Sequence, residues 1–218
     1  MFGPALSFLD DLAQNNNKTW FDANRTRYDR DVRDPALELV TALAPRLARL
    51  SPYLRAVAGG TGSSVSRIHR DTRFSSDKSP YKDWVGMHFT HKSGKDAPGL
   101  HLHISRSDCG VGLGVWMLEP APLAAVRTRI AEDIEWGGVR KALDGGGFRW
   151  IGDSLKRVPK GFPPEHPFAD DLCRKTYGAG RPVDVTLPAG KLADAVADGW
   201  RVGWPLMAFL CKAMGVPL

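Results

Sequence analysis

The chain has 218 residues, of which 43% are hydrophobic, so one domain can bury a sizeable core without metals or disulfides. Its formal net charge of +6 comes from 30 basic and 24 acidic side chains, a mild excess that suits a solvated basic surface as readily as nucleic-acid binding. The three cysteines are far apart without a CxxC pair, which argues against a disulfide framework or a zinc knuckle. We expect a single domain, residues 1–218, in a reducing cytosol, with no secretory signal and no membrane partner.

Residues 1–50 are predicted to be helical. Leucines recur at helical spacing from Leu6 to Leu12, and the asparagines at 15–17 are typical of the point where one helix ends and another begins. Over 18–50 the apolar residues are again spaced mainly by three, four and five, which indicates further helices. The first quarter of the chain therefore forms a helical N-terminal part.

From residue 51 the pattern becomes that of strands. Segments 54–58 and 64–70, joined by a glycine-rich turn at 59–62, are predicted to form a first hairpin. Alternating apolar and polar residues over 85–90 and 100–104 predict a second hairpin, and 110–116 adds a third strand to that group.

The rest of the chain mixes helices and strands. The expected elements are a helix from Pro122 to about Glu135, a strand at 148–151, a helix at 166–176, a last strand at 183–187, and a terminal helix interrupted near Gly203 or Pro205. Residues 51–218 thus form a sheet plus helices. We predict an α+β fold, with N-terminal helices followed by a mainly antiparallel sheet of hairpins with flanking helices.

Three strings of the sequence are specific enough to suggest relatives. They are NNNKTWF at 15–21, RIHRDTRFSSDKSPYK at 67–82 and LKRVPKGF at 155–162. With them the chain resembles, nearly end to end, an uncharacterised bacterial and fungal family of conserved hypothetical proteins, a domain of unknown function. The resemblance implies a single-domain protein and brings no activity, cofactor or catalytic residue. The family pattern has an aromatic residue where His101 stands, which weakens any chemistry that needs this histidine.

The segment 67–82 contains five basic side chains within sixteen residues. Arginine offers a planar fork of donors that matches phosphate or carboxylate, and lysine adds a point charge, so the segment predicts recognition of an acidic group. The residues that we assign to ligand binding are Arg67, Arg70, Arg73, Lys78, Lys82 and Arg157. The alternative is that Asp71, Asp77 and Asp83 pair with these cations internally and leave no place for a ligand.

A second basic segment, 156–161, could form the other wall of the same pocket together with Arg174 and Lys175. A solvated basic loop is the usual outcome for such a run of charge, and we favour that interpretation. The sequence does not say whether the two segments meet.

Any reaction at the basic segment would need an acid or a base. The candidates for that role are Asp71, His69 and Asp77, while Lys78 or Arg157 would stabilise developing negative charge, as in a hydrolase or a transferase. The leading hypothesis is a protein that binds a small phosphorylated or carboxylated ligand, with Arg67, Arg70 and Arg73 on the anion and Asp71 orienting them. No cofactor is indicated.

Strand pairing would bring His88, His101 and His103 together on the polar face of the sheet. Three imidazoles could bind zinc, but no carboxylate lies at a ligand-like spacing, so we favour ordinary histidines and assign no metal. The alternate glycines of 110–114 lack the GxGxxG and P-loop patterns. They would clear one face of a strand so that another element, or a ligand, can approach closely.

Two other classes of function remain open. Nucleic acid could bind the combined basic surface, although the scattered tryptophans are more typical of a core and no recognised nucleic-acid-binding motif is present. A protein-interaction module is the second alternative, and it would require Trp200, Trp204 and Phe209 to be accessible.

Overall fold

The computed structural model describes residues 1–94, 96–132 and 135–218. Its helices are α1 (Gly3–Gln14), α2 (Lys18–Ala23), α3 (Arg25–Tyr28), the π-helical turn η1 (Asp29–Arg33), α4 (Asp34–Leu50), α5 (Pro120–Glu132), α6 (Glu135–Gly145), α7 (Ala169–Leu172) and α8 (Ala189–Met214). Its strands are β1 (Trp84–Phe89), β2 (Gly99–Ser105), β3 (Cys109–Val115), β4 (Arg149–Ile151) and β5 (Tyr177–Pro182). In the part of the chain that is described, no helix is long and apolar enough to cross a bilayer.

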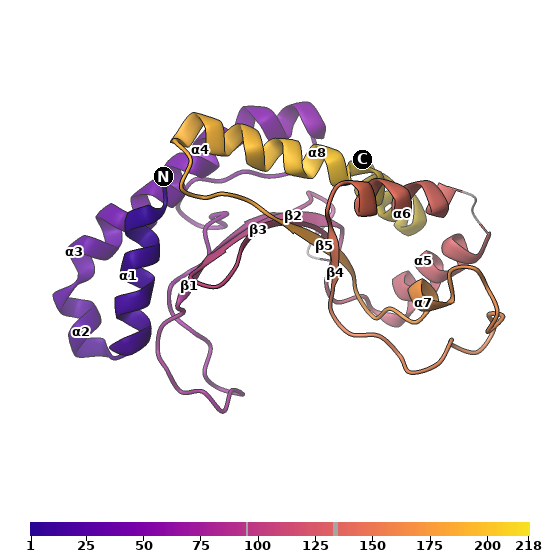
Figure 1. Ribbon diagram of the computed structural model, residues 1–218, viewed down its shortest axis with the longest axis horizontal. Helices are drawn as coiled ribbons and strands as arrows, with labels where there is room; N and C mark the ends of the chain where they lie inside the picture. The colour runs from indigo at the N-terminus through magenta and orange to yellow at the C-terminus, as the bar shows by residue number, and fades with distance from the viewer. Residues whose placement is uncertain (95, 133–134) are drawn as a thin grey trace.

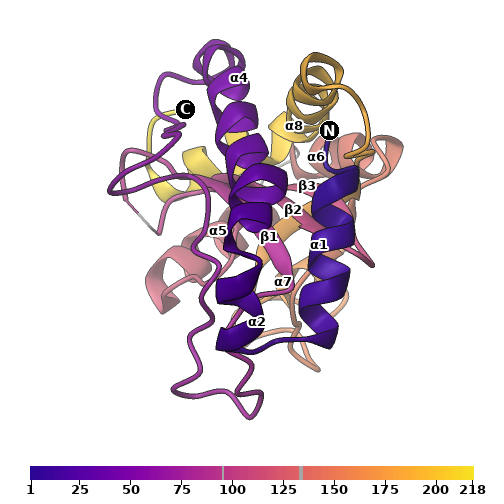
Figure 2. The same ribbon diagram turned by 90° about the vertical axis from the view of Figure 1, so that its left-hand side faces the viewer.

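The five strands form one antiparallel sheet in the order β1-β2-β3-β5-β4. Helices α4 and α8 lie over one face of it, side by side (Figures 1 and 2). The N-terminal helices stand at one end of the sheet, and α5, α6 and α7 stand at the other. This arrangement confirms the α+β class, with helices first and a mainly antiparallel sheet after them.

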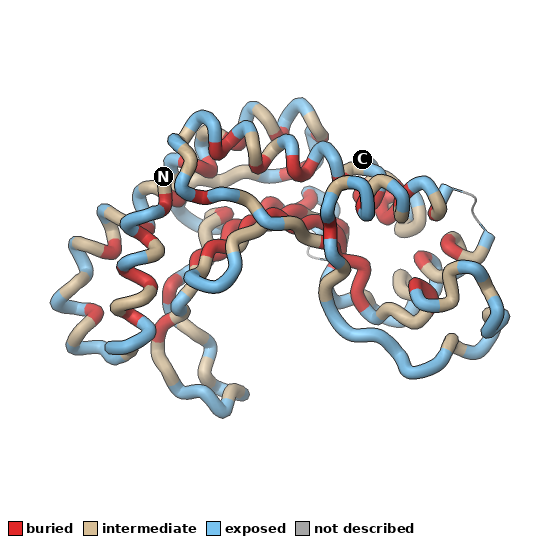
Figure 3. The backbone as a smooth tube through the Cα atoms, viewed as in Figure 1, coloured by how far each residue is buried: buried red, intermediate tan, exposed pale blue. Residues whose placement is uncertain are grey.

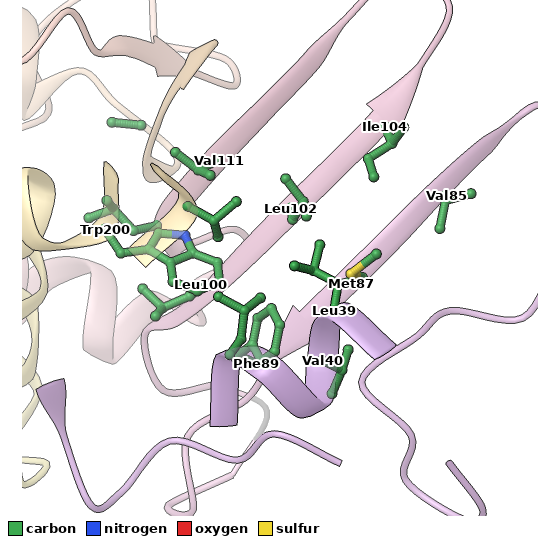
Figure 4. Packing of buried hydrophobic residues seen from close by; sticks show 14 of the residues in the cluster. Leu39, Val40, Val85, Met87, Phe89, Leu100, Leu102, Ile104, Val111 and Trp200 are labelled. Carbon is green, nitrogen blue, oxygen red and sulfur yellow. The ribbon is translucent and has the colours of Figure 1, made fainter. Parts of the chain in front are cut away.

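The core lies between the sheet and the two covering helices. Leu39 and Val40 of α4 point toward the face of the sheet that carries Met87 and Phe89 of β1 (Figure 4). The ring of Trp200 from α8 meets the ring of Phe89 edge-on, with 5.0 Å between their centroids. Buried residues follow the inner sides of the helices and the strands, while the long connections are mostly exposed (Figure 3). Alternation along the strands thus sorts apolar side chains onto this face.

The strands with clear alternation were predicted correctly. β1 and β2 pair as a hairpin in which His88 lies opposite His101, and β3 joins β2 as expected. β4 also falls within the short strand predicted at 148–151.

The hairpin expected over 54–58 and 64–70 is wrong, since these residues make only isolated bridges. Serine hydroxyls take the place of a ladder: Ser64 Oγ accepts from the amide of Val57 at 3.0 Å, and Ser63 Oγ accepts from that of Val65 at 3.2 Å. Such local side-chain bonds compete with strand pairing.

Elements of the second half also differ from expectation. The strand predicted at 183–187 is replaced by β5, whose glycines had hidden its strand character. The helix predicted at 166–176 shrinks to α7, because Ser154 and Arg174 pair as a β-bridge just after it. The helix expected from Pro122 to about Glu135 is confirmed as α5, over Pro120–Glu132, whereas α6, over Glu135–Gly145, was not predicted.

The terminal helix runs without interruption through Gly203 and Pro205, contrary to expectation. Pro205 lies on the exposed side of α8, whereas Leu206, Met207 and Leu210 continue its buried stripe. Burial of that stripe outweighs the hydrogen bond that proline removes from the helix.

Candidate functional site

The face of the sheet opposite α4 and α8 carries no helix over its centre among the described residues (Figure 1). We call this surface the open sheet face and define it by six side chains: Trp84, His88, His101, His103, Trp116 and Arg149. Strand register places five of them there or beside it. Trp84 pairs with Ser105, His88 with His101, Gly86 with His103, and Gly180 with Arg149. Polar and ring side chains thus collect on the side of the sheet that lacks helices.

Glycines make room for the rings of this face. The Cβ of an alanine at position 112 would fall 2.0 Å from Cε1 of His101, so the imidazole occupies the space that Gly112 leaves. The Trp84 ring fills the same kind of space at Gly86, and the Trp116 ring contacts Gly178. This confirms that the glycines of 110–114 permit close approach: the His101 ring approaches Gly112, and the backbone of β5 approaches Gly110 and Gly114.

Two hollows open on the face. One, of about 320 Å³, is lined by His101, His103, Asp108 and Arg149 together with backbone of β3 and β5. The other, of about 350 Å³, lies between His88, His101 and Trp116. Both volumes are in the range of small-ligand sites.

The pKa values of the three histidines of the open sheet face are lowered, which favours the neutral imidazole at neutral pH. Burial lowers the pKa of His101 to about 4, with further contributions from His88 and His103. Desolvation also lowers the pKa of His103 and of His88, and the charge of Lys82 adds to the effect on His88, although that residue keeps contact with solvent. Nδ1 of His101 is buried and has no hydrogen-bond partner. Neutral imidazoles can donate or accept hydrogen bonds but do not attract an anion by charge.

The histidines share one face, as predicted. Their rings are spread out, with 6.2 Å between the centroids of His88 and His101. Over residues 1–94, 96–132 and 135–218, no three His, Cys, Asp or Glu side chains are grouped so that they could hold a metal ion.

Most charges of segment 67–82 are paired within it. Arg73 forms a two-pronged bond with Asp71, and Arg70 contacts Asp77 at 2.6 Å and Asp83 at 3.4 Å. Lys78 donates to the carbonyl of Thr72 at 2.9 Å. The internal pairing foreseen as an alternative thus involves Arg70 and Arg73.

The proposed acids and bases, Asp71, Asp77 and His69, are each engaged in other contacts. Bonds from Arg73 hold the pKa of Asp71 below its usual range, and bonds from Ser79 do the same for Asp77. His69 is exposed and packs on the ring of Tyr81, with 5.3 Å between centroids. No hydrogen bond joins His69 to either carboxylate in the described structure, so these three residues are not arranged as acid and base.

Lys82 stands apart from the other cations of the segment. Its ammonium group donates to the carbonyl of Arg67 at 2.7 Å and lies 5.0 Å from the ring centroid of Trp84. Burial lowers the pKa of Lys82, and the charges of Arg67 and Arg70 lower it further. No carboxylate lies within 4 Å of this ammonium among the described residues. A partly desolvated positive charge, next to other positive charges, therefore borders the open sheet face.

The two basic segments lie at opposite ends of the sheet and do not form one pocket (Figure 1). Arg157 is exposed and pairs with no acidic side chain in the ranges described. Arg174 is held by Asp171 at 3.0 Å and lies over the ring of Trp150, 4.2 Å from its centroid. The interpretation of 156–161 as a solvated basic loop fits this placement.

Arg67 and His69 also line a groove of about 270 Å³ with Arg25 and Arg33. Sequence reasoning missed this neighbourhood because Arg25 and Arg33 come from the N-terminal helices, far away in the chain. Asp29 lies near both of them, at 3.5 Å from Arg25 and 3.8 Å from Arg33.

The asparagine-rich string at 15–17 positions the basic segment. Asn16 donates to the carbonyl of Tyr81 at 3.0 Å and accepts from its amide at 3.1 Å, as a neighbouring strand would. Asn17 caps α2 by accepting from the amide of Trp20, and Phe21 of that helix stacks on Tyr81 with 4.1 Å between centroids. The helical part thus fixes Tyr81 directly beside Lys82.

The aromatic residues divide into two groups. Trp136 and Trp200 are fully buried, as expected for a core, whereas Trp84 and Trp116 border the open sheet face, with Trp116 38% exposed. Of the three rings that a protein-interaction module would need accessible, Trp200 and Phe209 are buried and Trp204 is half-buried.

Comparison with known proteins identifies a family but no activity. No curated protein and no solved structure matches the chain. A family model described as "Conserved hypothetical protein (DUF2461)" matches residues 4–209, which include all three strings that suggested the resemblance. The chain belongs to this family of conserved hypothetical proteins.

Proposed function

We propose that the protein binds a small anionic ligand, phosphorylated or carboxylated, at the edge of the open sheet face where Lys82 lies. The observation that carries this proposal is the Lys82 ammonium group, which is half-buried beside Trp84 and has a carbonyl rather than a carboxylate as its partner. A desolvated cation without a counter-ion is costly, and a bound anion would offset that cost.

The surroundings of Lys82 support an anion rather than a cation as ligand. Arg67 and Arg70 add positive charge close to the ammonium group. The neutral imidazoles of His88 and His103 lie nearby on the same face and can donate hydrogen bonds to anionic oxygens. Asp83, the nearest carboxylate in sequence, is engaged by Arg70 at 3.4 Å.

The proposal is limited to binding. A hydrolase or a transferase would need a general acid or base, and Asp71 and Asp77 are held as hydrogen-bonded carboxylates with lowered pKa values. We also propose the reducing cytosol as the location of the protein, since Cys109, Cys173 and Cys211 are free thiols.

The test is a calorimetric titration of the protein with inorganic phosphate and pyrophosphate at low and at physiological salt. We expect Lys82→Ala to weaken binding roughly tenfold or more, because a charge-assisted hydrogen bond contributes ~1.5–3 kcal/mol. Lys141→Ala removes an exposed lysine of α6 and is the matched control.

Affinity should also fall as the pH rises through the lowered pKa of Lys82, at a lower pH than for an ordinary lysine. Equal affinity of the Lys82→Ala and Lys141→Ala proteins for both anions would disprove the site, and so would the absence of any binding by the unmodified chain.

A further inference from the structure

We propose that single-stranded nucleic acid lies across the open sheet face, with its bases against the rings and its phosphates at the two basic edges. This inference rests on the proposed function, since the anion at Lys82 would be one phosphate of the backbone. Two observations carry it: the spread of the rings over the face, and the position of positive charge at both of its edges.

The rings are too far apart for one small molecule. Trp84 pairs with Ser105, the last residue of β2. Trp116 contacts Gly178, which lies across β3 from Gly99, the first residue of β2. The seven residues of β2 separate these two positions by about 20 Å at ~3.4 Å per residue. A chain of bases can contact rings along such a path, whereas a single small ligand would use only one end.

The side chains between the two tryptophans suit bases. His88, His101 and His103 have lowered pKa values, which favours neutral imidazoles at neutral pH, and they lie on the same face. His88, the exposed member of the three, can exchange hydrogen bonds with the edge of a base. Imidazole and indole rings are the usual partners of unstacked bases on open sheets, which gives sequence-tolerant binding.

The positively charged side chains lie where the phosphate backbone of a bound single strand would run. Lys82 and its two arginine neighbours stand at the β1 edge, and Arg149 stands on β4 at the opposite edge. Arg149 is exposed, lines a hollow and has no acidic partner in the described part of the chain. Three carboxylates line the hollows alongside the rings, Asp108 in one and Asp96 and Glu119 in the other, and all three are exposed.

The experiment is fluorescence anisotropy with short labelled oligothymidylate and oligoadenylate, over a series of salt concentrations. We expect binding that weakens with salt, as phosphate contacts require. Trp116→Leu should weaken it roughly fivefold or more, while Trp116→Phe, which keeps a ring, should stay within about twofold of the unmodified chain. Tyr53→Leu is the matched control, because Tyr53 is 37% exposed and lines neither hollow.

Arg149→Ala tests the second edge, with Arg49→Ala on α4 as its control. We expect Arg149→Ala to weaken binding and to reduce its salt dependence, and Arg49→Ala to do neither. Duplex of the same length should compete poorly, because its bases are already stacked. The melting temperature of each variant shows whether it is folded.

Several results would overturn the inference. If phosphate binds through Lys82 but oligonucleotides bind no more tightly than free phosphate, the proposed function holds and the nucleic-acid inference fails. If neither binds, both fail. Oligonucleotide binding that Trp116→Leu and Arg149→Ala leave unchanged, or that duplex competes for equally, would place the nucleic acid elsewhere. Sedimentation showing a stable dimer that shields Trp116 from quenchers would assign the face to a second copy.

Discussion

At the scale of single residues, His101 connects the packing of the sheet to the chemistry of its open face. Its ring fills the space above Gly112, and that burial is what lowers its pKa to about 4. The fold needs a ring at this position, because the ring packs over Gly112. The histidine keeps the packing and adds a nitrogen that can form hydrogen bonds.

Burial of His101 makes the stability of the fold depend on pH. An unfolded histidine binds a proton near pH 6.5, but His101 in the fold does so only near about 4. The contribution of the buried, neutral His101 to the free energy of unfolding is therefore complete above pH ~6.5. It is lost as the pH falls toward about 4, because the unfolded chain then binds more protons than the folded chain. Between pH ~7 and pH ~5 we expect a loss on the order of 2 kcal/mol from this residue.

The check is urea unfolding at both pH values for the unmodified chain and for His101→Phe, which retains a ring without titrating. The free energy of unfolding of the variant should change less between the two pH values. An identical pH dependence in both proteins, or an NMR titration of His101 near pH 6.5, would contradict the assignment.

The residues of the candidate site could be predicted only in part. That segment 67–82 carries charge was evident, and Asp71 stands close enough in sequence to pair with Arg73. That Lys82, among the cations without a carboxylate partner, is the one partly buried against a ring was not evident, because that depends on how the segment enters β1. Lys82 lies two residues before Trp84, so both side chains point to the same face of the sheet and the ammonium group lies over the ring.

At the scale of elements, the strands that alternate were predictable and those rich in glycine were not. β1 and β2 carry apolar residues at every second position, a pattern that fixes which face is buried. β5, with Gly178 and Gly180, has no such pattern, and its pairing with β3 and β4 makes it a strand. Glycine lowers the strand propensity of the sequence, yet a Cβ at position 180 would lie 3.0 Å from the Ile151 side chain, so a close contact favours glycine there.

Two glycines with opposite roles give an element-scale prediction. Gly114 of β3 has φ of 122°, and a Cβ there would lie 2.1 Å from the carbonyl oxygen of Tyr177, which is backbone. Gly114→Ala should cost about 3 kcal/mol or more, because both the conformation and the contact are unfavourable. Gly138 is exposed on α6 with open space around it, so Gly138→Ala should stabilise by ~0.5–1 kcal/mol.

Thermal and urea unfolding of the two variants would measure both effects. Far-ultraviolet circular dichroism serves as the control that each variant keeps its secondary structure. A Gly114→Ala protein as stable as the unmodified chain would mean that β3 and β5 do not pair as closely as the structure has them.

At the scale of the whole molecule, α8 links the parts that the sequence suggested separately. Its 26 residues extend about 39 Å, and it contacts α4, α5 and α6 as well as β2 and β3. Arg46 of α4 bonds Asp194 of α8 at 2.6 Å, and the two helices run together over the sheet (Figure 2). The helical part, residues 1–50, therefore shares its core with the sheet. The sequence could not show this, because α4 and α8 lie far apart in the chain.

A shared core predicts that the chain unfolds as one unit, in line with the single domain expected over 1–218. Leu43 of α4 is fully buried, so Leu43→Ala should lower the free energy of unfolding by about 2–5 kcal/mol. In native-state hydrogen exchange the most protected amides of α4, β2 and β3 should lose the same free energy, since all of them open only when the whole molecule unfolds. Glu38→Ala, on the exposed side of α4, should leave every amide unchanged. If Leu43→Ala weakened the protection of α4 alone while β2 and β3 kept theirs, residues 1–50 would form a separate unit, and the open sheet face would keep its shape without them.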